Sequence, residues 1–170
     1  MNTIYLKGAE CFIPDHFGSI MLTTSIALPS TFTPLQRILL TANGNLQLLL
    51  SSFHNSPVTI KILKNILIND LYYDRCVGIE CVGRLMCTAY SKVFTKTEKA
   101  KELVVSGKVG IGQLFRYLKV LPEFELIGCG LLENKAMNIK LGFWRRYVLS
   151  SEDIKCEIYE EFEKDCLDNE

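Results

Sequence analysis

The sequence lacks an excess of charge of either sign, a long apolar run, and any repeat or low-complexity stretch. Its 19 Lys and Arg residues balance 19 Asp and Glu residues, whereas proteins that bind nucleic acids usually carry a basic surplus or a basic stripe. The uninterrupted apolar runs contain only a few residues, and a helix that spans a bilayer needs about 20. We therefore expect neither a nucleic-acid partner nor a membrane partner.

The composition is that of a globular protein, because 48% of the 170 residues are hydrophobic and 22% are charged. No linker or shift of composition divides the chain, so we predict a single domain over residues 1–170. Residues 1–10 have neither the layout of a signal peptide nor the Arg- and Ser-rich character of a transit peptide. We expect a monomer without a targeting segment, whose partner is a small molecule.

The residues for metal or thiol chemistry are poorly arranged. The seven cysteines contain no CxxC pair, and the histidines are His16 and His54. A structural zinc site needs close ligand pairs at set spacing, and a thiol nucleophile needs a neighbouring base. We expect reduced, mostly buried thiols, no metal, and histidines in surface or capping positions. Gly110 and Gly112 lack the third glycine of a dinucleotide fingerprint, so we expect a tight turn there, although the amides of the following helix could hold a carboxylate.

Three helices are predicted from capping residues and apolar spacing. The first follows Thr33 and Pro34, because threonine caps a helix and proline suits its first position. The second, over residues 97–105, is capped by Thr97. The third covers residues 111–118.

Apolar runs and alternation predict the strands. Residues 46–53 form an apolar run between two turn signals, which indicates a strand, whereas residues 58–68 fit a strand or a helix. Two alternating segments on either side of a turn at residues 83–84 predict a hairpin. The strands of this hairpin are residues 75–82 and 85–93. Two further strands are predicted over residues 144–149 and 154–162. Hairpins with helices inserted between them indicate an α+β domain on an antiparallel sheet.

Two charged residues are in phase with the apolar face of their strands. Side chains alternate across a strand, so Arg75 shares a face with Val77 and Ile79, and Glu160 shares one with Ile158. An unpaired charge on a buried face costs several kcal/mol or shifts its pKa. Each of these two charges therefore needs a partner.

Two interpretations of these charges are open. In the first, Arg75 and Glu160 pair with each other or lie at strand ends near water. In the second, Arg75 binds an anionic ligand with both arms of its guanidinium group, and Glu160 forms a hydrogen bond or moves a proton. Arg116 or Arg146 could serve a second carboxylate, but Arg146 is in phase with Val148 and is expected at the surface.

The order of several short motifs resembles that of the chorismate pyruvate-lyase (4-hydroxybenzoate synthase) family, including its plastid and cyanobacterial branch. The motifs are LQRILL (35–40), NGNLQ (43–47), RCVGI (75–79), IGQLF (111–115), RRYVL (145–149) and IYEEF (158–162). They extend over about residues 30 to 165. No single motif is specific, so the resemblance lies in their order and spacing.

The resemblance implies a six-stranded antiparallel sheet with helices that close an internal ligand cavity. It implies cleavage of chorismate to 4-hydroxybenzoate and pyruvate without a metal or an organic cofactor. The arginine of the family that holds a ligand carboxylate falls on Arg75, and its essential glutamate falls on Glu160. The ligand-lining positions of the family fall on Leu46 and Ile111.

The chemistry of that reaction suits these residue types. The ring becomes aromatic as the enolpyruvyl group leaves, so no redox partner is needed. Arg75 would hold the ring carboxylate, and Glu160 would act as a positioned, hydrogen-bonding acid. The alternative is a non-catalytic module that binds a small aromatic acid, which is favoured by two departures from the family pattern, Asn43 and Gln47. We expect the plastid stroma as the location, with a cyanobacterial cytoplasm as the alternative.

Overall fold

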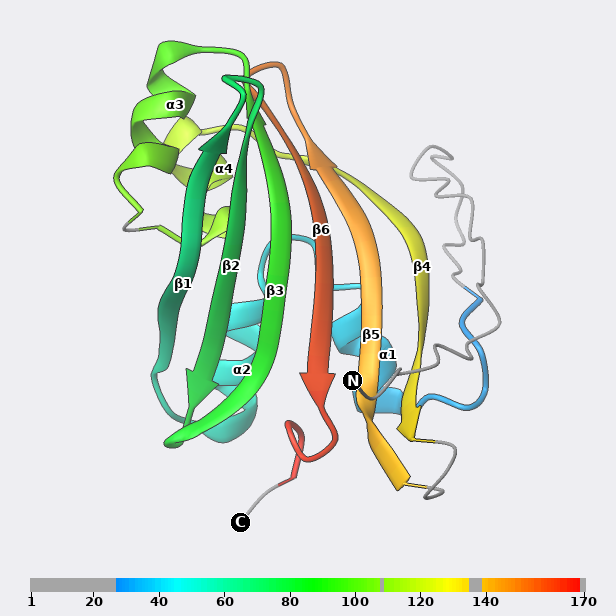
Figure 1. Cartoon of the computed structure of the whole chain (residues 1–170). Helices are drawn as coiled ribbons and strands as arrows, with labels where there is room; N and C mark the ends of the chain where they lie inside the picture. The colour runs from blue at the N-terminus through cyan, green and yellow to red at the C-terminus, as the bar shows by residue number, and fades with distance from the viewer. Residues whose placement is uncertain (1–26, 108, 135–138, 169–170) are drawn as a thin grey trace.

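The computed structural model of the chain describes residues 27–107, 109–134 and 139–168. These residues form an α+β fold with a six-stranded antiparallel sheet and four helices (Figure 1). The helices are α1 (Pro34–Leu40), α2 (Leu46–His54), α3 (Glu98–Val105) and α4 (Ile111–Leu118). The strands are β1 (Val58–Ile68), β2 (Tyr72–Cys81), β3 (Arg84–Thr95), β4 (Glu123–Asn134), β5 (Ile139–Ser150) and β6 (Ile154–Glu163).

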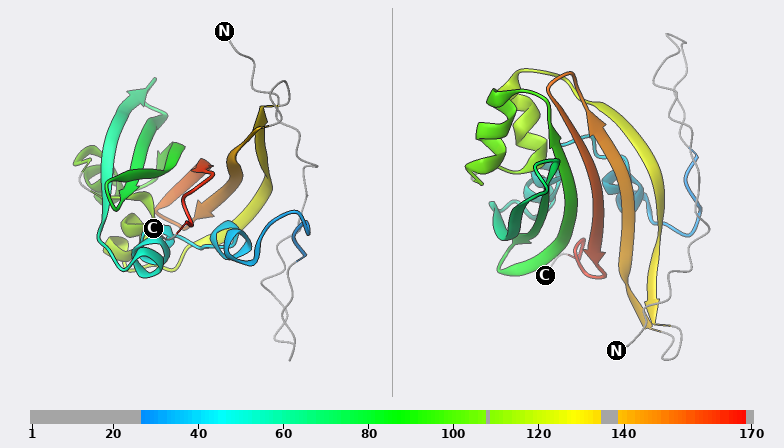
Figure 2. Two further views of the ribbon diagram at one scale, coloured as in Figure 1. Left: turned by 90° about the horizontal axis from the view of Figure 1, so that it is seen from below. Right: turned by 45° about the horizontal axis from the view of Figure 1, so that its top comes forward.

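The strands follow the order β1-β2-β3-β6-β5-β4 across the sheet. The last strand of the chain, β6, therefore lies in the middle of the sheet, between β3 and β5. The helices lie on one face of the sheet (Figures 1 and 2). None of the described helices is long and apolar enough to cross a membrane.

The predicted helix starts are confirmed. The Thr33 hydroxyl accepts a hydrogen bond from the backbone N–H of Gln36, and the Gln36 side chain accepts one from the N–H of Thr33, which makes a capping box. Thr97 accepts from the N–H of Ala100 at the start of α3 in the same way. The predicted helix over residues 111–118 is α4, which follows Gly110.

The predicted strand over residues 46–53 is wrong, because this segment forms helix α2. Its apolar run contains leucine and glutamine, which favour a helix, and no β-branched residue. Leu46 and Leu50 lie one helical turn apart and are buried, whereas Leu48 is exposed. Asn55 ends the helix in the left-handed conformation. The apolar run alone could not distinguish a buried strand from a short helix.

The structure also settles β1 and adds β4. Residues 58–68, which fitted a strand or a helix, pair with β2 along their whole length. No strand was predicted over residues 123–134, yet they pair with β5. The register shifts between Leu126 and Gly128, and this irregularity removes the period of two by which a strand is recognised.

The core consists of two apolar clusters between the helices and the sheet. One contains Leu40 and Leu50 from the helices together with Ile79. The other contains Leu114 from α4 together with Ile158. Five of the described cysteines are buried thiols, as expected: Cys81, Cys87, Cys129, Cys156 and Cys166. The expectations for Cys11 and His16 lie outside the described residues.

Candidate ligand pocket

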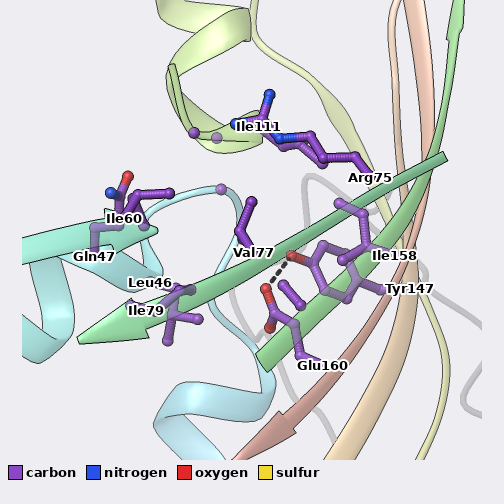
Figure 3. Close-up of a pocket in the computed structure, with 14 residues that line it drawn as sticks. Leu46, Gln47, Ile60, Arg75, Val77, Ile79, Ile111, Tyr147, Ile158 and Glu160 are labelled. Atoms are coloured by element: carbon purple, nitrogen blue, oxygen red, sulfur yellow. Dashed lines mark hydrogen bonds between the residues drawn. The ribbon is translucent and has the colours of Figure 1, made fainter. Parts of the chain in front are cut away.

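A pocket lies between the two core clusters, under the starts of α2 and α4 (Figure 3). Its wall includes Leu46, Gln47, Arg75, Ile111, Tyr147 and Glu160. About 50 Å³ is open to the centres of water-sized molecules. One water molecule needs roughly 10–15 Å³ on this measure and occupies about 30 Å³ in the liquid, so the pocket has room for about 100–150 Å³ of ligand. That volume suits a ligand with one ring, not a nucleotide.

The four residues predicted as a site are brought together in this pocket. Arg75 comes from β2 and Glu160 from β6, so both line it from the sheet. Leu46 is the first residue of α2 and Ile111 is the first residue of α4, so both line it from the helices. The pocket is therefore closed by two helix starts that are 65 residues apart in sequence.

Arg75 is a buried cation with unused hydrogen-bond donors. Its side chain is 1% exposed, and Nη2 donates to the carbonyl oxygen of Val109 at 2.6 Å. Nε and Nη1 are buried without a partner among the described residues. Burial lowers the pKa of Arg75, and the nearby Cys156 thiol opposes this only in part. An anion in the pocket would relieve the unfavourable burial of this charge.

Two helix starts reinforce the positive character of the pocket. The first N–H groups of a helix have no partner within the helix and carry partial positive charge. Neither Asn45 before α2 nor Gly110 before α4 makes a side-chain capping hydrogen bond. In Figure 3 the Arg75 side chain extends toward Ile111 at the start of α4. Arg75 and this helix start therefore form one electropositive corner of the pocket.

Glu160 lies at the other end of the pocket and is held from behind. Its Oε2 accepts a hydrogen bond from Arg145 Nε at 2.6 Å, and its Oε1 accepts one from the Tyr147 hydroxyl at 2.9 Å. Both partners are buried. Burial, followed by the charge of Glu160, raises the pKa of Tyr147 well above its ordinary value, so this hydroxyl remains a donor. A carboxylate has about four acceptor sites, so two remain for a ligand.

Arg75 and Glu160 do not pair with each other, contrary to one of the two interpretations from the sequence. Glu160 pairs with Arg145 instead. On the intervening strand β3, Ser91 pairs with Arg75 of β2 and Ala89 pairs with Glu160 of β6. The two charged residues are therefore two strands apart across the sheet and offset by two residues along it. With about 4.8 Å between strands and about 3.4 Å between residues, their Cα atoms are about 12 Å apart. Both side chains nevertheless line the same pocket.

Sequence reasoning missed Arg145 and Tyr147. Both alternate in phase with Phe143 and Leu149, which are fully buried. The periodicity that identified Arg75 and Glu160 could therefore have identified this second inward arginine. Its neighbour Arg146 is exposed, as predicted.

The other candidates lie away from this pocket. Arg116 is exposed on α4. His54 Nε2 lies 2.9 Å from the carbonyl oxygen of Cys166, so the ring is held by a hydrogen bond, as expected for a capped histidine. Among the described residues, no group of three or more His, Cys, Asp or Glu side chains is placed to hold a metal ion.

The charges in and behind the pocket favour an anionic ligand. Arg75, Arg145 and Glu160 are the buried charged residues of the described chain, and together they carry one net positive charge. The electropositive corner and the Glu160 acceptor lie at opposite ends of the pocket, with the apolar side chains of Val77 and Ile158 between them (Figure 3). The arrangement fits a small ring with a carboxylate at one end and a hydroxyl at the other. No model of a known protein family matches the chain, and neither does any curated protein.

Proposed function

We propose that this protein is a chorismate lyase, which cleaves chorismate to 4-hydroxybenzoate and pyruvate without a cofactor. The observation that carries the proposal is the buried, partly unpartnered guanidinium group of Arg75, which lines a one-ring pocket together with the acceptor Glu160. The resemblance of the motif order to the chorismate pyruvate-lyase family supports the same reaction.

In this proposal Arg75 anchors the ring carboxylate. A planar guanidinium group donates two parallel hydrogen bonds to a carboxylate, and Nε and Nη1 are the donors that are free to do so. The N–H groups at the start of α4 supply further positive charge. Because these groups are already in place, they would hold the ring in one orientation without rearrangement.

Glu160 acts at the opposite side of the ring. When the bond between the ring carbon and the enolpyruvyl oxygen breaks, the neighbouring ring carbon loses a proton and the ring becomes aromatic. The released enolpyruvate takes up one proton to become pyruvate. As an ion pair with Arg145, Glu160 begins as a carboxylate; it would accept the ring proton and return it to the leaving group, so protons balance. It therefore serves as the acid only in the second half of the step.

The test is to incubate the purified protein with chorismate and to follow 4-hydroxybenzoate and pyruvate by chromatography. We expect both products in equal amounts from the parent protein, and a loss of roughly a hundredfold or more in Arg75→Met, which removes the carboxylate anchor. Arg146→Met, which alters an exposed arginine, is the matched control and should keep its activity. Equal rates in the parent and Arg75→Met would refute the proposal.

The second candidate is a binding module for a small aromatic acid that does not turn chorismate over. Glu160 favours it, because both of its oxygens are already hydrogen-bonded, which restrains a proton transfer. Gln47 in the pocket wall is a further departure from the family pattern. Thermal stabilisation by 4-hydroxybenzoate without any consumption of chorismate would select this function over catalysis.

A further inference from the structure

Arg145 contacts both Glu160, which lines the pocket, and the segment that closes the pocket. Its Nε donates to Glu160, and its Nη1 donates to the carbonyl oxygens of Leu39 at 2.8 Å, Leu40 at 3.3 Å and Ala42 at 2.8 Å. The guanidinium carbon lies 4.2 Å from the centre of the Tyr147 ring. The side chain is fully buried.

The three carbonyl groups belong to the end of α1 and the turn after it. Carbonyl groups at the end of a helix have no partner within the helix, and they carry partial negative charge. Arg145 therefore acts as a cap for this end of α1 from a strand more than 100 residues away in sequence. Two residues after Ala42 the chain reaches Gly44, and then Leu46 and Gln47, all of which line the pocket.

A guanidinium group is planar and rigid, so the direction of Nε constrains the direction of Nη1. The same group thus holds Glu160 with one nitrogen and the closing segment, residues 39–47, with another. A lysine at this position would carry the charge but could not span both partners as a fixed fork. The bulk of Tyr147 beneath the guanidinium group restricts its position further.

We infer that Arg145 is a positioning residue that couples the state of Glu160 to the closing segment, residues 39–47. A ligand hydroxyl that binds Glu160 would then also stabilise the segment that covers the ligand. The ligand part of this inference rests on the proposed function. The coupling itself rests only on the contacts of Arg145.

The coupling is tested without ligand, by amide hydrogen exchange of residues 39–47 in four proteins: the parent, Glu160→Gln, Arg145→Lys and the double variant. We expect Glu160→Gln to speed exchange of this segment roughly fivefold in the parent background and less than about twofold in the Arg145→Lys background. Arg146→Lys, the exposed neighbour, should leave the segment unchanged. An equal effect of Glu160→Gln in both backgrounds would overturn the inference.

If Arg145→Lys does not fold, Tyr147→Phe replaces it. This variant removes the other hydrogen bond to Glu160 and leaves Arg145 in place. We expect exchange of the closing segment to rise in Glu160→Gln but not in Tyr147→Phe, and an equal rise in both would contradict the coupling.

A ligand arm separates this inference from the proposed function. Calorimetry should show that 4-hydroxybenzoate binds roughly tenfold more weakly to Arg145→Lys than to the parent protein. Absence of binding to the parent protein would refute the proposed function, while a non-additive exchange effect would still support the coupling. Equal affinity of 4-hydroxybenzoate for both proteins would refute the claim that Arg145 couples ligand binding to the closing segment.

Discussion

Two buried arginines of this protein have opposite energetic roles. Two nitrogens of Arg145 share four acceptors, one carboxylate and three carbonyl groups within 3.3 Å, and only its Nη2 has no partner in the described structure. Arg75 has one acceptor, the carbonyl of Val109, and two nitrogens without a partner in the described structure. Arg145 therefore stabilises the folded state. The incompletely paired charge of Arg75 lowers the free energy of unfolding. Residues kept in that condition are typical of binding sites.

This difference can be measured by replacing each arginine with methionine, which keeps much of the apolar stem. Arg145→Met should lower the free energy of unfolding by about 3–5 kcal/mol, because it leaves Glu160 buried without a counter-charge. Arg75→Met should stay within about 1 kcal/mol of the parent or exceed it, since it loses one hydrogen bond but removes an unpaired charge. Urea unfolding at pH 7 measures both, and similar losses in the two variants would contradict this assignment.

At the scale of elements, the pocket depends on a backbone contact between the turn before α2 and the first turn of α4. A Cβ atom on Gly112 would lie 2.0 Å from the carbonyl oxygen of Gly44, so any side chain there would push the turns apart. A Cβ on Gly110 would come within 3.0 Å of the Gln47 amide. Glycine at these positions lets the starts of α2 and α4 meet above the sheet.

Gly112→Ala should therefore separate the two turns. Alanine is the better helix former, so the variant would be slightly stabilised if α4 stood alone. We expect instead a loss of about 1–3 kcal/mol in stability and a loss of 4-hydroxybenzoate binding, because the backbone contact must open. Thermal denaturation with and without ligand measures both effects. Gly128→Ala is the control, since its new methyl group would make an ordinary contact of 3.6 Å with Trp144; identical behaviour of the two variants would argue against the contact.

At the scale of the whole molecule, the fold encloses thiols that resist ionisation. Burial, with smaller effects from Asp165 and Asp168, raises the pKa of Cys166 to about 12 from an ordinary 9.0. Burial also raises the pKa of Cys156 and Cys87. In the unfolded chain these thiols ionise near pH 9, whereas in the folded protein they keep their protons. Folding is thus favoured below pH 9 and is opposed progressively above it.

The stability of the protein should therefore fall as the pH rises from 9 toward 12. The unfolded state binds fewer protons in this range, and each such thiol contributes a slope of about 1.4 kcal/mol per pH unit. Urea unfolding at pH 8, 9, 10 and 10.5 measures the slope. Cys166→Ala should be less stable at pH 8, where a small cavity is its main effect, but its stability should fall less steeply above pH 9. A slope unchanged by this substitution would show that Cys166 does not contribute.

Much of the fold was predictable where local geometry decides the outcome. Thr33 and Thr97 begin helices because a hydroxyl can satisfy amides three residues away. The hairpin of β2 and β3 follows from alternation on both sides of one turn. By contrast, α2 was mistaken for a strand, and β4 was missed because a register shift breaks its alternation.

The candidate site divides in the same way. The inward direction of Arg75 and Glu160 follows from the sequence alone. Every second side chain of a strand points to the same face, and both residues alternate in phase with buried apolar neighbours. Only the tertiary structure decided their partners. Arg145 is 15 residues from Glu160 and more than 100 from the carbonyls of α1, and the backbones of Gly44 and Gly112 touch beside the pocket. Such contacts depend on how the strands are ordered and how the helices pack upon them, which no local period encodes.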